Sequence, residues 1–189
     1  MNPGKNRWEK SLIDFCAPTL AGLKCANLFG MIYNSEEELA HEISRLNHLC
    51  NGKGIQIRVM NRRNRRALLL VFRENMLNQV MEQEYVWELL CECGYQRSCL
   101  AVTLDTLAGR IETAESFPHE IGIFLGYPYC DVKGFIEHAG EDFIFCGYWK
   151  VYANENQSRK RFREFDLCRE CYRKSYRSGM GLAQLAVAV

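Results

Sequence analysis

The sequence lacks long apolar runs, a targeting segment and an excess of charge of either sign. No run of apolar residues reaches the ~20 that a helix needs to cross a bilayer. The polar start MNPGKNRWEK has no apolar core of the kind found in secretory signals. Because 24 basic residues face 23 acidic ones, the net charge of +1 gives no overall attraction to nucleic acid or lipid. We therefore expect a cytoplasmic protein with no membrane partner.

Several standard catalytic and cofactor motifs are missing as well. The absence of GxGxxG and Walker patterns argues against a standard dinucleotide or P-loop nucleotide site. The chain also lacks HExxH, the zinc-protease motif, and GxSxG, the nucleophile elbow of many hydrolases. No pattern in the sequence identifies a cofactor.

What is present describes an ordinary folded protein. Hydrophobic residues make up 48% of the chain and charged residues 25%, values typical of a globular protein and unlike those of a disordered or rod-like one. The 189 residues suit one domain, and no repeat, low-complexity segment or linker divides them. We predict a single domain over residues 1–189.

Apolar periodicity predicts most of the helices. It indicates a first helix over residues 17–33, with Pro18 in its first turn, and a second that begins after an N-cap at Ser35 and ends before Gly52. Further helices are predicted over residues 74–93 (in two pieces), 98–114, 119–125, 129–138 and 154–178. A short strand over residues 121–125 stays open as an alternative.

Strand signals are fewer. Residues 55–60 alternate between apolar and polar, and residues 67–72 form a continuous apolar run after an arginine-rich turn, so we predict a β-hairpin over residues 55–73. The aromatic stretch FIFCGYWKVY predicts a third strand over residues 143–152. The fold class is therefore α+β, with a small antiparallel sheet packed against several helices.

Three motifs carry a family resemblance. These are FCAPTLAGLK near the start, FPHEIGIFLGYP followed by DVKGFI, and CGYWKVY. Together they resemble an uncharacterised domain-of-unknown-function family that is typical of anaerobic Gram-positive bacteria. The resemblance implies a bacterial, cytoplasmic, single-domain protein, and it carries over no functional residue.

Cys16 and His119 form the first candidate site. We expect Cys16 at the start of the first helix, where exposed N–H groups and the helix dipole favour a thiolate. His119 lies in a segment rich in Gly and Pro, and it would act as the base for a Cys16 nucleophile, with Glu120, Asp131 or Asn154 to orient it. The alternative is that Cys16 is a packed small residue and His119 part of a turn.

A small-molecule pocket is the second candidate. The segment 117–136 and the strand 146–152 combine glycine and proline with polar and aromatic side chains, among them Tyr127, Asp131, Tyr148 and Lys150. On a regular strand, Tyr148 and Lys150 share one face, so a planar ligand would stack on Tyr148 beside Lys150. We expect a binding or regulatory protein whose pocket contains these residues with Cys16, His119 and Glu120.

Two further readings concern cysteines and arginines. The pairs Cys91–Cys93 and Cys168–Cys171 have spacings compatible with half of a thiolate metal site, although packed or surface thiols explain them as well.

Arginines crowd the hairpin and the last helix, which would allow binding of a polyanion or nucleic acid. The functions left open are thus a small-molecule binder, a thiol-dependent enzyme and a polyanion binder, and the oligomeric state stays undetermined.

Overall fold

Residues 6–113 and 116–189 are described by the computed structural model, in which helices accompany small antiparallel sheets. This is the α+β class that the sequence predicts. Unit 1 comprises the residues up to Glu74 together with Phe165–Val189, and unit 2 comprises Asn75–Glu164. The second boundary falls inside helix α8 (Glu155–Arg177). We describe each unit by itself.

Helix α1 (Arg7–Leu20) starts earlier than predicted. The Asn6 side chain caps it by accepting a hydrogen bond of 2.8 Å from the Trp8 backbone N–H. The helix ends in a Schellman motif: Gly22 has a φ of +77°, and the Leu23 N–H donates to Pro18 O at 2.8 Å. Because glycine adopts this left-handed conformation readily, the chain leaves the helix here.

The prediction of one helix over residues 17–33 is therefore wrong. Its second half is β1 (Ala26–Ile32), whose buried residues include Ala26, Phe29 and Met31. The apolar residues of this stretch fit the period of a helix about as well as that of a strand. Because the chain leaves α1 at Gly22, the residues after it form a strand. Pro18 lies in the last turn of α1 and not in a first turn.

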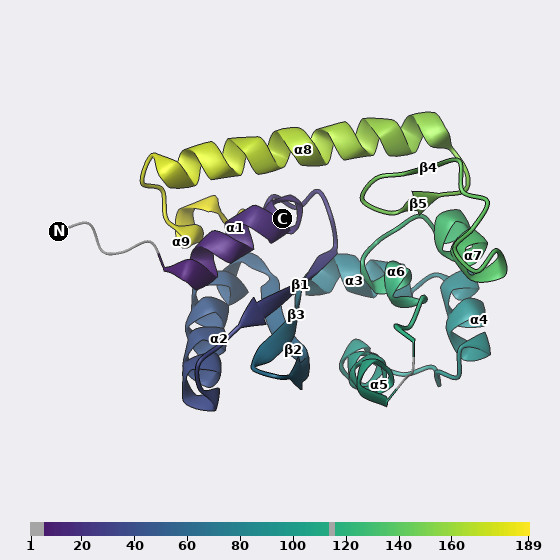
Figure 1. Ribbon diagram of the computed structural model, residues 1–189, viewed down its shortest axis with the longest axis horizontal. Coiled ribbons are helices and arrows are strands. Elements are labelled where there is room, and N and C mark those ends of the chain that lie inside the picture. Colours follow the sequence, from purple (N-terminus) through teal and green to yellow (C-terminus); the bar gives the residue numbers. More distant parts are fainter. Residues whose placement is uncertain (1–5, 114–115) are drawn as a thin grey trace. The chain divides into compact units, whose positions relative to one another are not determined.

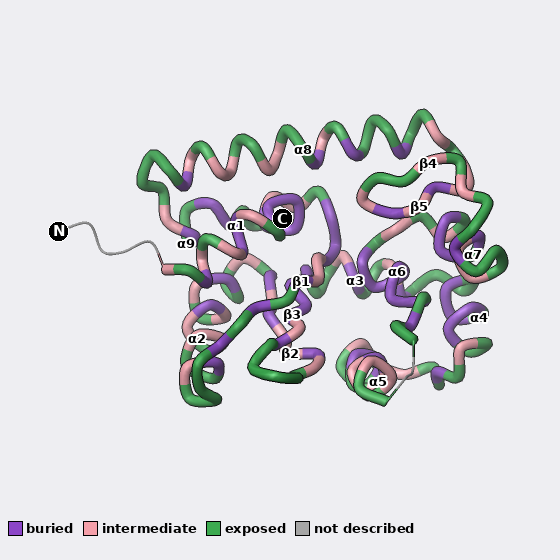
Figure 2. The backbone as a smooth tube through the Cα atoms, in the orientation of Figure 1, coloured by how far each residue is buried: buried purple, intermediate pink, exposed green. Residues whose placement is uncertain are grey.

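The sheet of unit 1 has three antiparallel strands in the order β1-β3-β2. Strands β2 (Ile55–Arg63) and β3 (Arg66–Arg73) form the predicted hairpin. Asn64 and Arg65 both have positive φ, which is the geometry of a two-residue type I′ turn. The hairpin tip is exposed while the body of β3 is largely buried (Figure 2).

Helices cover this sheet. Helix α1 packs against β1, and α2 (Glu36–Cys50) packs against β2 (Figure 1). Ser35 caps α2 as predicted, with the Glu38 N–H donating to Ser35 Oγ at 3.1 Å. The short helices η1 (Asn51–Lys53) and α9 (Leu182–Leu185) complete the unit. The core gathers apolar side chains of the sheet and helices, including Leu12, Cys16, Leu46, Ile57, Leu69, Val71 and Leu185.

Pro18 leaves a backbone carbonyl in α1 without its usual donor. Proline has no N–H, so Asp14 O receives no hydrogen bond from the residue four positions later. Arg169 of α8 supplies donors instead, with its Nε at 3.2 Å and its Nη2 at 3.1 Å from that oxygen. Arg173 adds an N–H at 3.3 Å and binds the Asp14 carboxylate at 2.8 Å. These contacts fasten the unit 1 part of α8 to α1.

Arg73, at the end of β3, is fully buried. Its guanidinium donates to backbone carbonyl oxygens from three separate segments. The distances are 2.6 Å to Thr19 O, 2.7 Å to Leu20 O, 2.7 Å to Val187 O and 3.2 Å to Lys53 O. The C-terminal segment, the end of α1 and η1 are thus joined by one side chain.

Unit 2 contains mostly short helices. These are α3 (Glu74–Met81), which begins at the boundary, α4 (Glu84–Glu92), α5 (Leu100–Thr113), α6 (Ile121–Phe124) and α7 (Tyr129–Glu137). They agree with the predicted helices over 74–93, 98–114, 119–125 and 129–138. The alternative strand over residues 121–125 is not formed.

The predicted strand over residues 143–152 is a tight hairpin instead. Two-residue strands β4 (Phe145–Cys146) and β5 (Lys150–Val151) pair with each other and form a separate sheet. The chain reverses at Gly147, whose N–H donates to Trp149 O at 3.0 Å. A Cβ on Gly147 would lie 2.2 Å from the Phe162 ring, so the turn packs too closely on α8 for any larger residue.

No helix in the described part of the chain combines the length and the apolar character that spanning a membrane requires. Helix α8 has 23 residues, the greatest length among them, and it carries many charged side chains.

Replacement of Arg73 tests its role in unit 1. We expect Arg73→Met to lower the free energy of unfolding by about 3 kcal/mol or more, because four carbonyls lose a donor, and the contacts to Thr19 O and Leu20 O are buried. Urea denaturation followed by circular dichroism measures this. Arg63→Met is the matched control, since Arg63 is exposed near the tip of the same hairpin. Equal stability of the two variants would contradict the assignment.

Candidate functional site

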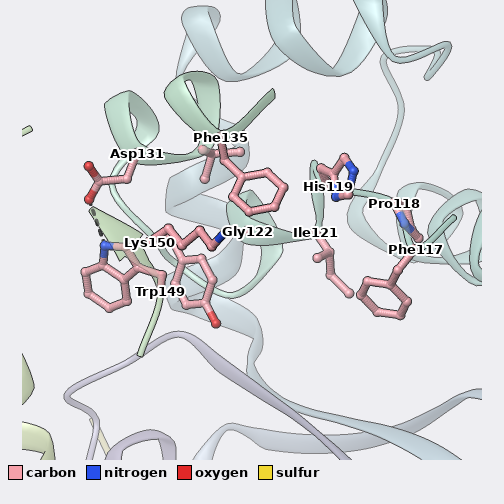
Figure 3. Close-up of a pocket in the computed structure, with 11 residues that line it drawn as sticks. Phe117, Pro118, His119, Ile121, Gly122, Asp131, Phe135, Trp149 and Lys150 are labelled. Carbon is pink, nitrogen blue, oxygen red and sulfur yellow. Dashed lines mark hydrogen bonds between the residues drawn. The ribbon is translucent and has the colours of Figure 1, made fainter. Parts of the chain in front are cut away.

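A pocket of about 200 Å³ lies within unit 2 (Figure 3). Its walls come from the segment before α6, from α6 and α7, and from the β4–β5 hairpin. Most of its lining is apolar or aromatic, and Lys150 brings a positive charge. The lining residues are Phe117, Pro118, His119, Ile121, Gly122, Tyr127, Asp131, Val132, Phe135, Trp149 and Lys150.

Two glycines bring α6 close to the rest of the pocket. A Cβ on Gly122 would lie 2.7 Å from a Val132 methyl group and 3.1 Å from the Tyr127 ring, so only glycine allows this approach of α6 to α7. Gly126, with a φ of +68°, ends α6 in a second Schellman motif, in which the Tyr127 N–H donates to Gly122 O at 2.9 Å. The motif places Tyr127 in the pocket wall.

Asp131 fixes the hairpin to α7. Its carboxylate is buried and accepts hydrogen bonds from the Trp149 indole N–H at 2.7 Å and from the backbone N–H groups of Tyr152 at 2.8 Å and Ala153 at 3.0 Å. The bond to Trp149 is the dashed line in Figure 3. The carboxylate oxygens are therefore used within the protein, and Asp131 positions a wall of the pocket.

The Trp149 ring is held on two sides by other aromatic rings. Tyr127 stacks on it with a centroid distance of 4.9 Å, and Phe162 meets it edge to face at 4.4 Å. Aromatic pairs in these geometries add stability beyond the area that they bury. Trp149 thus forms a rigid wall.

Lys150 crosses the pocket. Figure 3 shows its side chain between Phe135 and Trp149, with the nitrogen toward the middle of the labelled group. The ammonium donates to Gly140 O at 2.5 Å and lies 4.6 Å from the Phe143 ring centroid and 5.7 Å from that of Phe135. Attraction between a cation and a π-system holds the ammonium beside these rings.

His119 stands at the opposite side of the pocket from Trp149 (Figure 3). It is exposed, and its ring lies 4.8 Å from that of Phe135. His119, Tyr127, Asp131 and Lys150, which the sequence singles out, all line the pocket. Their assignment to ligand binding stays a prediction.

Glu120 and Tyr148 lie outside this lining. Glu120 is buried and accepts hydrogen bonds from Arg110 at 2.6 Å and from the Tyr95 hydroxyl at 3.0 Å. Burial and the neighbouring Glu120 carboxylate raise the pKa of Tyr95. Tyr148 packs on Phe162, with a centroid distance of 5.4 Å. The expected pairing of Tyr148 with Lys150 on one strand face is wrong, because the turn at residues 147–149 interrupts the alternation.

Cys16 belongs to unit 1, whereas His119 belongs to unit 2. Cys16 lies in the second half of α1 and not at its start, and its side chain is fully buried. Burial raises the pKa of its thiol, and the charges of Lys24 and Arg169 only partly oppose this effect. Of the two readings of Cys16, these facts support the packed thiol, and its pairing with His119 stays a prediction.

The cysteine pairs are divided between the units as well. In unit 2, Cys91 is exposed and Cys93 is half-buried. In unit 1, Cys168 and Cys171 lie three positions apart on α8. Burial, and then the neighbouring Cys171, raise the pKa of Cys168 to about 11. Across residues 6–113 and 116–189, no three or more side chains of His, Cys, Asp and Glu are grouped so that they would hold a metal ion.

Several arginines of the two predicted clusters have partners inside the protein. Arg73 is buried among carbonyls, Arg169 and Arg173 bind Asp14, and Arg62 pairs with Glu36 at 2.9 Å. Binding of a polyanion stays a prediction. These contacts reduce the positive charge that the two arginine clusters could offer to such a partner.

Sequence reasoning missed three aromatic walls of the pocket. Phe117 and Phe135 stand at the ends of the Gly- and Pro-rich segment, and Trp149 lies in the turn between β4 and β5. The signal for Trp149 was the glycine two positions before it, which favours a turn over a continuous strand.

Thiol accessibility gives one prediction. At pH 8 we expect iodoacetamide to leave Cys16, Cys25 and Cys50 unmodified in the native protein, since all three are buried and burial raises the pKa of each thiol. Exposed Cys146 and Cys171 should react rapidly. Peptide mass spectrometry measures both rates, with urea-unfolded protein as the control. Native labelling of Cys16 as fast as Cys171 would refute the packed-thiol reading.

Asp131 gives another prediction. Removal of its carboxylate in Asp131→Ala should lower the free energy of unfolding by roughly 3 kcal/mol, because the buried Trp149 indole N–H and two part-buried backbone N–H groups lose a charged acceptor. Urea denaturation provides the value. Glu137→Ala serves as control, since Glu137 lies on the same helix, is exposed and makes only a 3.7 Å ion pair with Lys133. A change below about 0.5 kcal/mol for Asp131→Ala would show that the carboxylate does not hold the hairpin.

Comparison with known proteins gives a family and no named relative. Searches of curated proteins and of solved structures each found no match. Residues 12–186 match a family described as protein of unknown function (DUF3793), and this range includes all three sequence motifs. The chain belongs to the DUF3793 family of proteins of unknown function.

Proposed function

We propose that the protein binds a small molecule in the pocket of unit 2. The observation that carries this proposal is a cavity of about 200 Å³ with aromatic walls and one ammonium group beside them. Concave, mostly apolar cavities with few polar groups are the usual form of ligand sites. A binding or regulatory role needs no further group at this site.

The walls of the pocket support this function through their rigidity. Asp131 holds Trp149 by a hydrogen bond of 2.7 Å, and Tyr127 stacks on the same ring. The close packing at Gly122 fixes α6 against α7. A site whose walls are held before binding loses less conformational entropy when the ligand enters.

The aromatic composition supports binding of a ligand with an apolar body. Phe117, Tyr127, Phe135 and Trp149 offer ring faces or edges to whatever fills the space. Each ring adds buried apolar area and a preferred geometry for another ring. We therefore expect fragments with one or two rings to bind better than sugars or aliphatic polyols of the same size.

A fragment screen tests the proposed function. Ligand-observed NMR with one- and two-ring fragments of positive, negative and zero charge should give a set of binders. We expect Phe135→Ala to weaken their binding about tenfold, because it removes one wall of the pocket. Native mass spectrometry of protein purified without oxygen would show whether a ligand is carried along.

Tyr85→Ala provides the control for this screen. Tyr85 is also an aromatic residue of unit 2, it is 44% exposed, and it is not part of the pocket lining. Its replacement should leave fragment binding unchanged. A screen without binders, or binders that Phe135→Ala and Tyr85→Ala affect equally, would overturn the proposal.

A further inference from the structure

We infer that the ligand of this pocket is a planar carboxylic acid of one or two rings whose carboxylate binds the Lys150 ammonium. The inference rests on the proposed function and adds the chemical class of the ligand. Three observations carry it: the size of the cavity, the position of the Lys150 nitrogen, and the engagement of the Asp131 oxygens.

The size of the cavity limits the ligand. An apolar protein cavity of about 150 Å³ accommodates benzene, and the pocket here has about 200 Å³. The additional space suits one substituent on a ring or a second fused ring. Nucleotides and cofactors of similar size need several times this volume.

The position of Lys150 supplies the attraction for an anion. An ammonium carries three N–H donors, and Gly140 O accepts one of them at 2.5 Å. This bond and the rings of Phe135 and Phe143 hold the nitrogen in place. A carboxylate that enters the pocket can accept the remaining donors. Among apolar walls, such a charge-assisted bond is stronger than in water.

The Asp131 carboxylate does not compete for this role. It lines the pocket, but its oxygens accept hydrogen bonds from Trp149 Nε1, Tyr152 N and Ala153 N. These donors partly offset the negative charge of Asp131, and they orient its carboxylate toward the hairpin. Of these two charged groups, the one presented to a ligand is therefore the Lys150 ammonium, which repels cations and favours anions.

The aromatic walls select a planar shape. Phe135 and Trp149 lie on either side of Lys150 in Figure 3, and His119 and Phe117 stand beyond the nitrogen end of this side chain. A ring attached directly to the carboxylate would lie between these walls with its acid group at the nitrogen. Benzoate and indole-3-carboxylate have this form.

The experiment compares two acids with their neutral amides. Calorimetry at pH 7.5 measures benzoate against benzamide, and indole-3-carboxylate against indole-3-carboxamide. We expect the acids to bind at least tenfold more tightly than the amides. Lys150→Met should weaken the acids by about 10- to 100-fold, the loss of a charged hydrogen bond, and weaken the amides far less, because they lose only the bond to a neutral carbonyl oxygen.

Two further variants keep the test decisive. Lys133→Met removes an exposed lysine from α7 and should change neither acid nor amide binding. Lys150→Gln removes the charge and retains an N–H for Gly140 O, so it separates loss of charge from loss of structure if Lys150→Met fails to fold. It should weaken the acids selectively as well.

The outcomes separate this inference from the proposed function. Amides that bind as tightly as acids, or a Lys150 variant that weakens both equally, would overturn the acid class while the pocket stays a binding site. The same holds if only neutral or basic fragments bind and Phe135→Ala weakens them. If neither the acids nor any fragment binds, both the inference and the proposed function are wrong.

Discussion

A buried charge must have its hydrogen-bonding groups satisfied, and Arg73 in unit 1 and Asp131 in unit 2 both meet this requirement. In unit 1, Arg73 donates to carbonyls at the end of α1, in η1 and near the C-terminus. In unit 2, Asp131 accepts from the β4–β5 hairpin and its following residues. Loss of either charge would leave the groups that it binds without this partner, and a buried polar group without a partner costs more free energy than its hydrogen bond contributes.

Most of the helices could be predicted because their signals are local. The capping side chain of Ser35 and the apolar stripe of α2 lie within one stretch of sequence, and the turn at Asn64 follows from residues that tolerate positive φ. The exception is α1, which contains Pro18 in its last turn. A proline is tolerated there because Arg169 and Arg173, 155 and 159 positions away in the sequence, supply donors for Asp14 O. A local sequence pattern contains no information about contacts at such separations.

The pocket was predictable in part for the same reason. Glycine and proline marked residues 117–128 as a segment with special backbone geometry, and Gly122 and Gly126 have the close approach and positive φ that such residues allow. Side-chain direction was not predictable. Trp149 faces the pocket because a turn replaces the expected strand, and Asp131 faces the hairpin because donors there compete for its oxygens. Both outcomes depend on contacts between separate elements.

The division of unit 1 between two stretches of sequence has a consequence for biosynthesis. The bond from Arg73 to Val187 closes a loop of 114 positions, and unit 2 lies inside that loop. A ribosome completes Asn75–Glu164 before it makes Val187, one of the four residues whose carbonyls accept from Arg73. Domains usually mature in the order of their synthesis, whereas here we expect the inserted unit to mature first. Until Phe165–Val189 is synthesised, the part of unit 1 that ends at Glu74 stays incompletely folded. In this state its apolar strands are exposed and accessible to chaperones.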